Sequence, residues 1–144
     1  KHACAALWNL SAKRSYSVSL VQLGAGEKII RAMDNSPMNA VVQTKACGAL
    51  WNLSQHPNSK ITLMRLDVAN RILRAMKNHP SEEILQAKGC GALRSLASGN
   101  VPNIMSLRNL GSIALISLAH TNHPDSSSVE RQSRSALRTL AKME

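Results

Sequence analysis

The sequence predicts an all-α protein made of repeated three-helix units, an α-solenoid. Three observations predict this class. The segment Ala-Leu-Trp-Asn-Leu-Ser at 6–11 returns unchanged at 49–54, and in degraded form at 92–97 and 136–141. An Asn-x-Pro turn recurs at the same intervals of 43 to 44 residues, at 35–37, 78–80 and 122–124. No run alternates apolar and polar residues as a half-buried strand would.

The segment after each turn has the spacing of an amphipathic helix. Within residues 39–55 the apolar positions step by 4, 3, 1 and 3, which is one face of a helix with 3.6 residues per turn. These positions are Val42, Ala46, Ala49, Leu50 and Leu53. The same positions recur one and two periods later, so each period is expected to end in a long helix.

Two shorter apolar segments precede each turn. They lie at 17–23 and 26–34, 59–66 and 68–78, and 103–110 and 112–121. Gly24, Asp67 and Gly111 separate the members of each pair, as a helix end or sharp corner would. The expected unit is therefore a short, a medium and a long helix, and paired long helices are the nearest alternative.

These signals divide the chain into four parts. We expect a truncated third helix at 1–12 and full units at 13–55, 56–98 and 99–144. The last long helix carries Arg131, Arg134, Arg138 and Lys142, as a polar terminal cap would. Because the chain opens inside a third helix, we expect a fragment of a longer array. An intracellular location, cytoplasmic or nuclear, is the weakest of these expectations; no apolar stretch approaches the length of a membrane span.

The Ala-Leu-Trp-Asn-Leu-Ser segments resemble the third helix of armadillo repeats. The Trp-Asn form is similar to that of adenomatous polyposis coli and catenin-like proteins and of some plant and protist armadillo proteins. The resemblance implies a right-handed superhelix whose third helices line a peptide-binding groove, with a ladder of asparagines on the peptide backbone. The ladder positions here are Asn9, Asn52, Ser95 and Thr139. Importin-type arrays carry Trp one turn earlier, where this chain has Ala5, Gly48, Gly91 and Ser135, so an importin-like role is not expected.

A helical wheel identifies the same face without the family. With the core centred on Ala46 and Leu53, the residues pointing away are Thr44, Gly48, Trp51 and Gln55, flanked by Lys45 and Asn52. An outward tryptophan at a repeated position indicates an interaction site. Alternatively, the tryptophans pack against neighbouring units. The small residues either leave room for a ligand backbone or allow close packing of adjacent third helices.

Charge on this face has one sign. The chain has 18 Lys and Arg against 8 Asp and Glu, a formal charge of +10, which favours anionic partners. The candidate groove residues are Trp8, Asn9, Lys45, Gly48, Trp51, Asn52, Gln55, Lys88, Gly91, Arg94, Ser95, Arg131, Ser135, Arg138 and Thr139. Arg94 and Arg138 take the tryptophan position, so the groove should become more cationic toward the C-terminal end.

Catalytic and metal-binding patterns are absent from the sequence. Cys4, Cys47 and Cys90 share one repeat position, about 10 Å apart if neighbouring helices stack normally, which is too far for a disulfide or a shared zinc. Buried packing is their expected role. His120 and His123 near Asp125 lack further ligands. No nucleotide loop, catalytic triad or acid/base pair stands out, so no enzyme, cofactor or metal is expected.

The resulting hypothesis is a protein-binding scaffold. We expect an extended acidic or phosphorylated segment of a partner protein to lie along the third helices. Nucleic-acid binding by a basic solenoid is the second hypothesis, and a purely structural segment of a longer array is the third. Membrane insertion is not expected.

Overall fold

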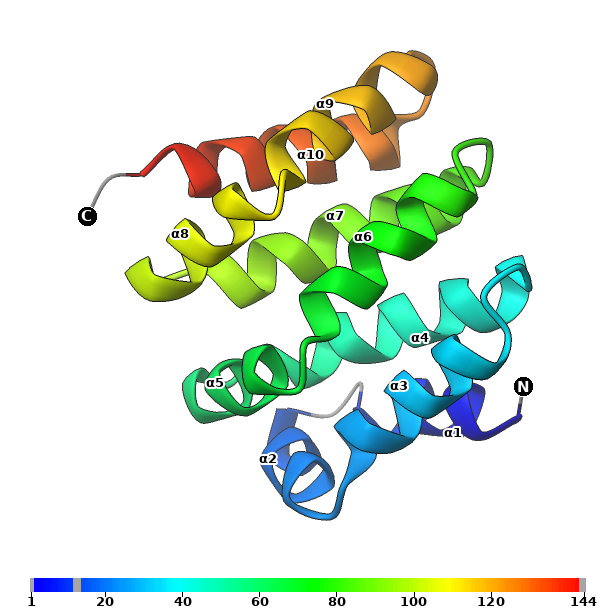
Figure 1. Cartoon of the computed structure of the whole chain (residues 1–144), viewed down its shortest axis with the longest axis vertical. Helices are drawn as coiled ribbons and strands as arrows, with labels where there is room; N and C mark the ends of the chain where they lie inside the picture. The colour runs from blue at the N-terminus through cyan, green and yellow to red at the C-terminus, as the bar shows by residue number, and fades with distance from the viewer. Residues whose placement is uncertain (1, 12–13, 143–144) are drawn as a thin grey trace.

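The structure is a computed structural model that describes residues 2–11 and 14–142. This part of the chain forms ten α-helices and no strand, so the predicted all-α class is confirmed (Figure 1). The helices are α1 (His2–Ser11), α2 (Arg14–Gln22), α3 (Ala25–Asn35), α4 (Ala40–Leu53), α5 (Pro57–Arg65), α6 (Val68–Asn78), α7 (Glu83–Ala97), α8 (Val101–Asn109), α9 (Ser112–Asn122) and α10 (Ser127–Ala141).

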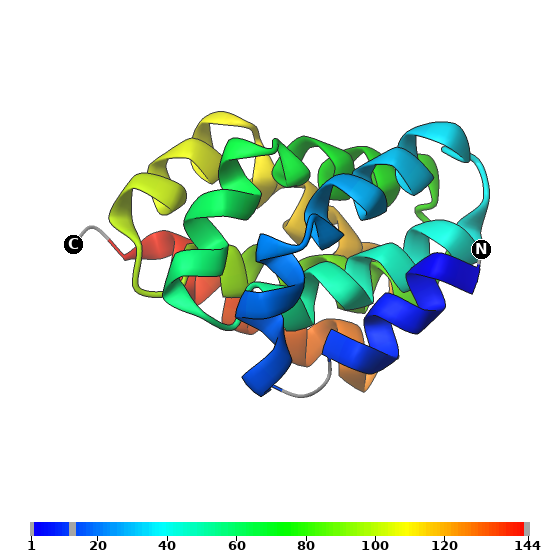
Figure 2. The same cartoon turned by 90° about the horizontal axis from the view of Figure 1, so that it is seen from below.

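The helices lie in rows. The long helices α1, α4, α7 and α10 pack side by side in chain order, and α3, α6 and α9 form a second row against them. In Figure 1 the second row lies in front of the long helices, and Figure 2 shows the two rows from below. The two termini lie at opposite ends of the molecule (Figure 1). Each long helix therefore has one side toward the second row and one side away from it.

The corners between first and second helices adopt left-handed backbone. Gly24, Asp67 and Gly111 have φ of 87°, 63° and 81°, which confirms the predicted breaks. Glycine adopts this region without strain, whereas Asp67 is the one non-glycine residue with positive φ in the described part of the chain. Its carboxylate pairs with Arg71 at 3.0 Å, one turn into α6.

The first helices begin earlier than the apolar pattern predicted. α5 begins at Pro57 and α8 at Val101, two residues before the expected 59 and 103. A capping side chain precedes each: His56 Nδ1 accepts from the Asn58 N–H at 3.2 Å, and Asn100 Oδ1 accepts from the Asn103 N–H at 3.0 Å. Proline in the first turn of a helix removes no hydrogen bond, because the N–H groups there have no partner within the helix. These helices therefore begin directly after the polar capping residues His56 and Asn100, before the apolar pattern starts.

The three cysteines are free and buried, as predicted. Burial raises the pKa of the Cys47 and Cys90 thiols to about 12. They pack among the apolar residues of the continuous core that runs through the long helices.

Two glutamines buried in the long helices connect them to the second row. Gln43 and Gln86 each donate through Nε2 to two backbone carbonyls at the end of the preceding helix, at 2.8 to 3.0 Å. The carbonyls of Met33 and Met76 depend on these bonds, because the residue four positions further on is a proline, which has no N–H to donate. The other two carbonyls, of Ser36 and His79, also accept from a backbone N–H. The third unit has Glu130 at this position, which pairs with Arg134 at 2.8 Å instead.

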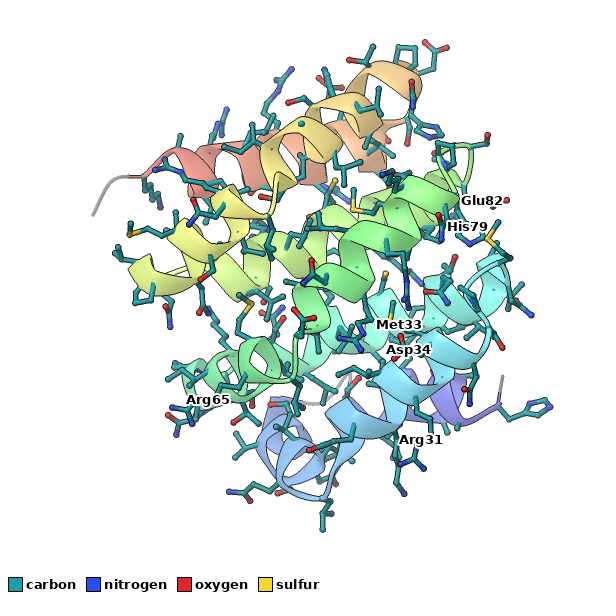
Figure 3. All side chains as sticks on the ribbon, viewed as in Figure 1. Arg31, Met33, Asp34, Arg65, His79 and Glu82 are labelled. Atoms are coloured by element: carbon teal, nitrogen blue, oxygen red, sulfur yellow. The ribbon has the colours of Figure 1, made fainter. Side chains whose placement is uncertain are left out.

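Neighbouring units are joined at their turns. His79 Nε2 lies 3.0 Å from the Pro37 carbonyl, and His123 Nε2 lies 2.8 Å from the Pro80 carbonyl. Since a carbonyl only accepts, each Nε2 carries the proton. The repeated Asn-His-Pro turn therefore has a structural use, and Figure 3 labels His79 there.

The second row carries an ion-pair cluster. Asp34 of α3, labelled in Figure 3, pairs with Arg71 at 3.1 Å and with Arg74 at 2.6 Å, both on α6. Both arginines hold the pKa of the Asp34 carboxyl below its usual value through hydrogen bonds. These two arginines are thus neutralised within the protein, whereas Lys28, Arg31 and Lys77 of the same two helices have no ion pair among the described residues.

Candidate ligand-binding face on the third helices

The candidate site is the side of α1, α4, α7 and α10 that faces away from α3, α6 and α9. We call it the third-helix face. It is defined by the repeated outward positions of these helices. They are Val41, Ile84 and Ser128; Thr44, Ala87 and Arg131; Lys45, Lys88 and Gln132; Gly48, Gly91 and Ser135; Trp8, Trp51, Arg94 and Arg138; and Asn9, Asn52, Ser95 and Thr139.

Trp8 lies across the next helix. Its Nε1 is 3.1 Å from where a Cβ on Gly48 would stand. Two ammonium groups approach the same ring: Lys88 Nζ lies 3.3 Å and Lys45 Nζ 4.3 Å from the ring centroid. Both distances are within the range of cation–π attraction. One indole from α1 is therefore held by side chains of α4 and α7.

Trp51 packs still more closely on the following helix. Three of its ring atoms lie 2.7 to 2.8 Å from where a Cβ on Gly91 would stand. Only hydrogen fits at that position. Gly48 and Gly91 are both buried, and both tryptophans are half-buried. The glycines thus serve the close packing of adjacent third helices, which is one of the two alternatives that the sequence left open for them, and they leave no open channel for a ligand backbone at these two positions.

The third unit replaces this pairing with polar residues. Arg94 stands where the earlier units have tryptophan, and Ser135 where they have glycine. Arg94 is half-buried, and its buried Nε has no hydrogen-bond partner among the described residues. Arg138 is exposed at the next position along the face.

Two of the four ladder positions link neighbouring long helices. Asn52 Nδ2 donates to the Trp8 carbonyl at 3.4 Å, and Ser95 Oγ donates to the Ser54 carbonyl at 3.1 Å. Ser95 is buried, whereas Asn52 is half-buried. The expectation that Ser95 contacts a ligand is therefore wrong, while the Asn52 side-chain carbonyl oxygen is not used in this link.

The remaining predicted polar residues differ in accessibility. Thr139 is buried and donates to the Ser135 carbonyl at 3.1 Å within its own helix, so it does not face a ligand. Gln55 donates to the Trp51 carbonyl at 3.0 Å and extends the end of α4. Asn9 is exposed.

Cations on the third-helix face are not neutralised. Arg71, Arg74 and Arg134 form ion pairs, but none of these three belongs to the outward positions that define the face. The cations of the face that have no ion pair with any described residue are Lys45, Lys88, Arg94, Arg131 and Arg138. Burial, and then repulsion from Lys45, lower the pKa of Lys88 to about 8. The charged form of Lys88 is therefore less stable on this face than it would be in water.

Three hollows open on this face. One, of about 180 Å³, is mainly apolar and lies between α7 and α10, where Trp51, Ile84, Ala87 and Gln132 line it. A second, of about 240 Å³, lies one unit earlier and is lined by Val41, Thr44 and Lys45 of α4, with Glu82 and Ile84 opposite. The third, of about 420 Å³, is lined by α10 alone, through Glu130, Arg131, Arg134, Ser135 and Arg138. Another hollow, of about 540 Å³, lies elsewhere, between α5 and α8.

Five residues that line the apolar hollow escaped the sequence prediction: Glu83, Ile84, Ala87, Ser128 and Gln132. Among them Ile84 is 64% exposed, and Val41, one period earlier, is 49% exposed. The signal was present as an aliphatic residue repeated at the start of two long helices. It was missed because the pattern alone assigns such residues to the core.

Metal and membrane chemistry find no support in the described part of the chain. It contains no group of three or more His, Cys, Asp and Glu placed to share a metal ion. None of its helices is long and apolar enough to cross a bilayer. In comparisons with known proteins, no family model, no curated protein and no solved structure matches this chain significantly.

Proposed function

We propose that this protein is a segment of an armadillo-type α-solenoid that binds an extended acidic segment of a partner protein along the third-helix face. The units would run over 13–55, 56–98 and 99–144, with α1 in the place of a third helix beside α4. Catalysis plays no part in this proposal; the chain acts as a scaffold.

The unpaired cations carry the proposal. On the second row, Asp34 neutralises Arg71 and Arg74, whereas Lys45, Lys88 and Arg131 on the third-helix face have no carboxylate partner in the described chain. The ammonium groups of Lys45 and Lys88 both approach the Trp8 ring, and the pKa of Lys88 is lowered there to about 8. Carboxylates or phosphates from a ligand would relieve this repulsion.

The exposed groups near these cations suit an extended peptide. Asn9 is exposed, and the half-buried Asn52 keeps a free side-chain oxygen that can accept from a peptide N–H. Ile84, near the start of α7, is exposed and offers apolar contact. Because α1, α4 and α7 pack side by side, an extended peptide that crosses them can reach these groups one after another.

The test uses a fluorescein-labelled decapeptide of Asp, Glu and Ser with one central leucine, and a random single-stranded oligonucleotide of similar charge. Fluorescence anisotropy is measured for both at low and at physiological salt. We expect the peptide to bind and the variant Arg131→Glu/Arg138→Glu to weaken it roughly tenfold, about 0.7 kcal/mol for each reversed charge.

The matched control is Lys28→Glu/Lys77→Glu, which makes the same charge change on exposed residues of α3 and α6. It should alter peptide affinity less than about threefold. Equal losses in both variants would mean attraction by net charge alone, and absence of peptide binding would overturn the proposal.

Nucleic-acid binding is the second candidate, because Arg131, Arg134 and Arg138 line one hollow on α10. It predicts that the oligonucleotide binds more tightly than the peptide and loses affinity steeply with salt, through release of counterions. That outcome in the same titration would replace the peptide proposal.

A further inference from the structure

Because the units repeat, the surroundings of Trp8 can be compared position by position with those of Trp51, one period later. At Trp8, the Lys88 side chain from two helices further along lies over the ring, with its Cδ 3.4 Å from the Cβ position of Gly48. One period later, the equivalent residues are Trp51, Gly91 and Gln132. A long unbranched side chain thus covers the first indole, and a shorter amide occupies the corresponding position at the second.

This difference leaves the second indole open. The hollow of about 180 Å³ beside Trp51 includes that ring in its wall, whereas the corresponding hollow of the preceding unit, of about 240 Å³, is lined by Val41, Thr44, Lys45 and Ile84 and does not include Trp8, which Lys88 covers. It is larger than one water, which takes up about 30 Å³ in the liquid. Its walls are mainly the apolar atoms of Trp51, Ile84 and Ala87. An apolar wall of this kind favours an apolar occupant over water.

The rim of the hollow selects among apolar and cationic occupants. Arg131 and Lys88 both border it and have no ion pair with any described residue. Glu83 also borders it; its carboxylate accepts from Ser126 Oγ at 2.6 Å and keeps its negative charge, so the rim carries two cations and one anion and is positive on balance. A lysine side chain from a ligand would therefore meet two like charges, whereas a neutral side chain next to a carboxylate would not.

We propose that the hollow beside Trp51 binds a single leucine- or methionine-sized side chain of the partner peptide, with a carboxylate of an adjacent peptide residue at Arg131. This inference rests on the proposed function and adds a specificity site to it. The ligand motif is then an apolar residue beside an acidic one, and not acidic charge alone.

Three peptides test the motif: the labelled decapeptide with central leucine, and its counterparts with alanine or lysine there. We expect alanine to weaken binding roughly 10- to 100-fold, the change that burial of one such side chain produces. Lysine should weaken it at least as much. Emission of Trp51 in a Trp8→Phe background should shift with the leucine peptide and not with the alanine peptide.

The variant Gln132→Lys tests this comparison of the two indoles directly. By analogy with Lys88 over Trp8, the new side chain should fill the hollow and weaken the leucine peptide about tenfold, although it adds a positive charge. The control Thr121→Lys adds the same charge on an exposed residue of α9, in the second row, and should leave affinity unchanged or slightly stronger. Retained helical circular dichroism and an unchanged midpoint of urea unfolding show that both variants are folded.

The outcomes separate this inference from the proposed function. If all three peptides bind equally and Arg131→Glu/Arg138→Glu still weakens them, the scaffold stands and the pocket is refuted. If Gln132→Lys strengthens the leucine peptide as Thr121→Lys does, the hollow is not occupied and the inference also fails. If no peptide binds, both proposals fail.

Discussion

The packing of Trp51 on Gly91 predicts a change of sign in a double-mutant cycle. A Cβ on residue 91 would stand 2.7 to 2.8 Å from three ring atoms of Trp51, closer than side chains approach one another. Overpacking of this kind costs about 1 to 3 kcal/mol. Replacing a mid-helix glycine with alanine contributes about 1 kcal/mol in the opposite direction. Gly91→Ala should therefore be neutral to destabilising, by up to about 2 kcal/mol.

In a Trp51→Ala background the clash between the new Cβ and the indole ring is absent, and only the higher helix propensity of alanine remains. Gly91→Ala should then stabilise the protein by about 1 kcal/mol, which gives a coupling free energy of about 1 to 3 kcal/mol between the two residues. Urea unfolding followed by far-ultraviolet circular dichroism measures all four proteins without relying on the deleted tryptophan.

Gly48→Ala serves as the graded control. Its Cβ would stand 3.1 Å from Trp8 Nε1, a tight contact that a small ring movement relieves, so its net effect should be near zero. The reasoning is refuted if Gly91→Ala has the same effect with and without Trp51, because the glycine would then serve backbone conformation and not ring packing.

Three further predictions follow from buried groups. Gln86→Leu removes both side-chain hydrogen bonds to the end of α6 and should lower the free energy of unfolding, measured in urea, by about 2 to 3 kcal/mol. Glu130 occupies the equivalent position but makes only an ion pair with Arg134, so Glu130→Leu should lower it by less than about 1 kcal/mol. Because the pKa of Lys88 falls to about 8 in the folded state from 10.5, the unfolded chain binds more protons between these values, so the free energy of unfolding should rise from pH 8 to pH 10.5 and Lys88→Met should reduce that rise. Burial raises the pKa of Cys47 and Cys90 to about 12, so both should resist a thiol reagent at neutral pH until urea is added, and rapid labelling of the native protein would contradict their burial.

Local sequence determines the helices and their breaks. The apolar period of 3.6 residues marks the long helices, and Gly24, Asp67 and Gly111 mark the corners, because backbone conformation there depends on a few neighbouring residues. The starts of α5 and α8 were missed by two residues, since capping and proline act before the apolar pattern begins.

The outward side of the long helices was also predictable, but not the use of each residue on it. A wheel correctly separates Trp51 from the core positions Ala46 and Leu53, since that depends only on helical geometry. It cannot tell whether an outward residue meets solvent or the next helix. Ser95 and Thr139, expected to face a ligand, are buried by neighbouring elements.

By itself, then, the sequence determined the helical class, the period near 43 residues and the surplus of positive charge. Only the tertiary structure decided that Gly91 receives the Trp51 ring, that Lys88 covers Trp8 and that a hollow remains beside Gln132. The reason is physical. Helix formation is settled within a few turns of chain, whereas these contacts join residues 40 to 81 positions apart and depend on how closely neighbouring helices approach one another.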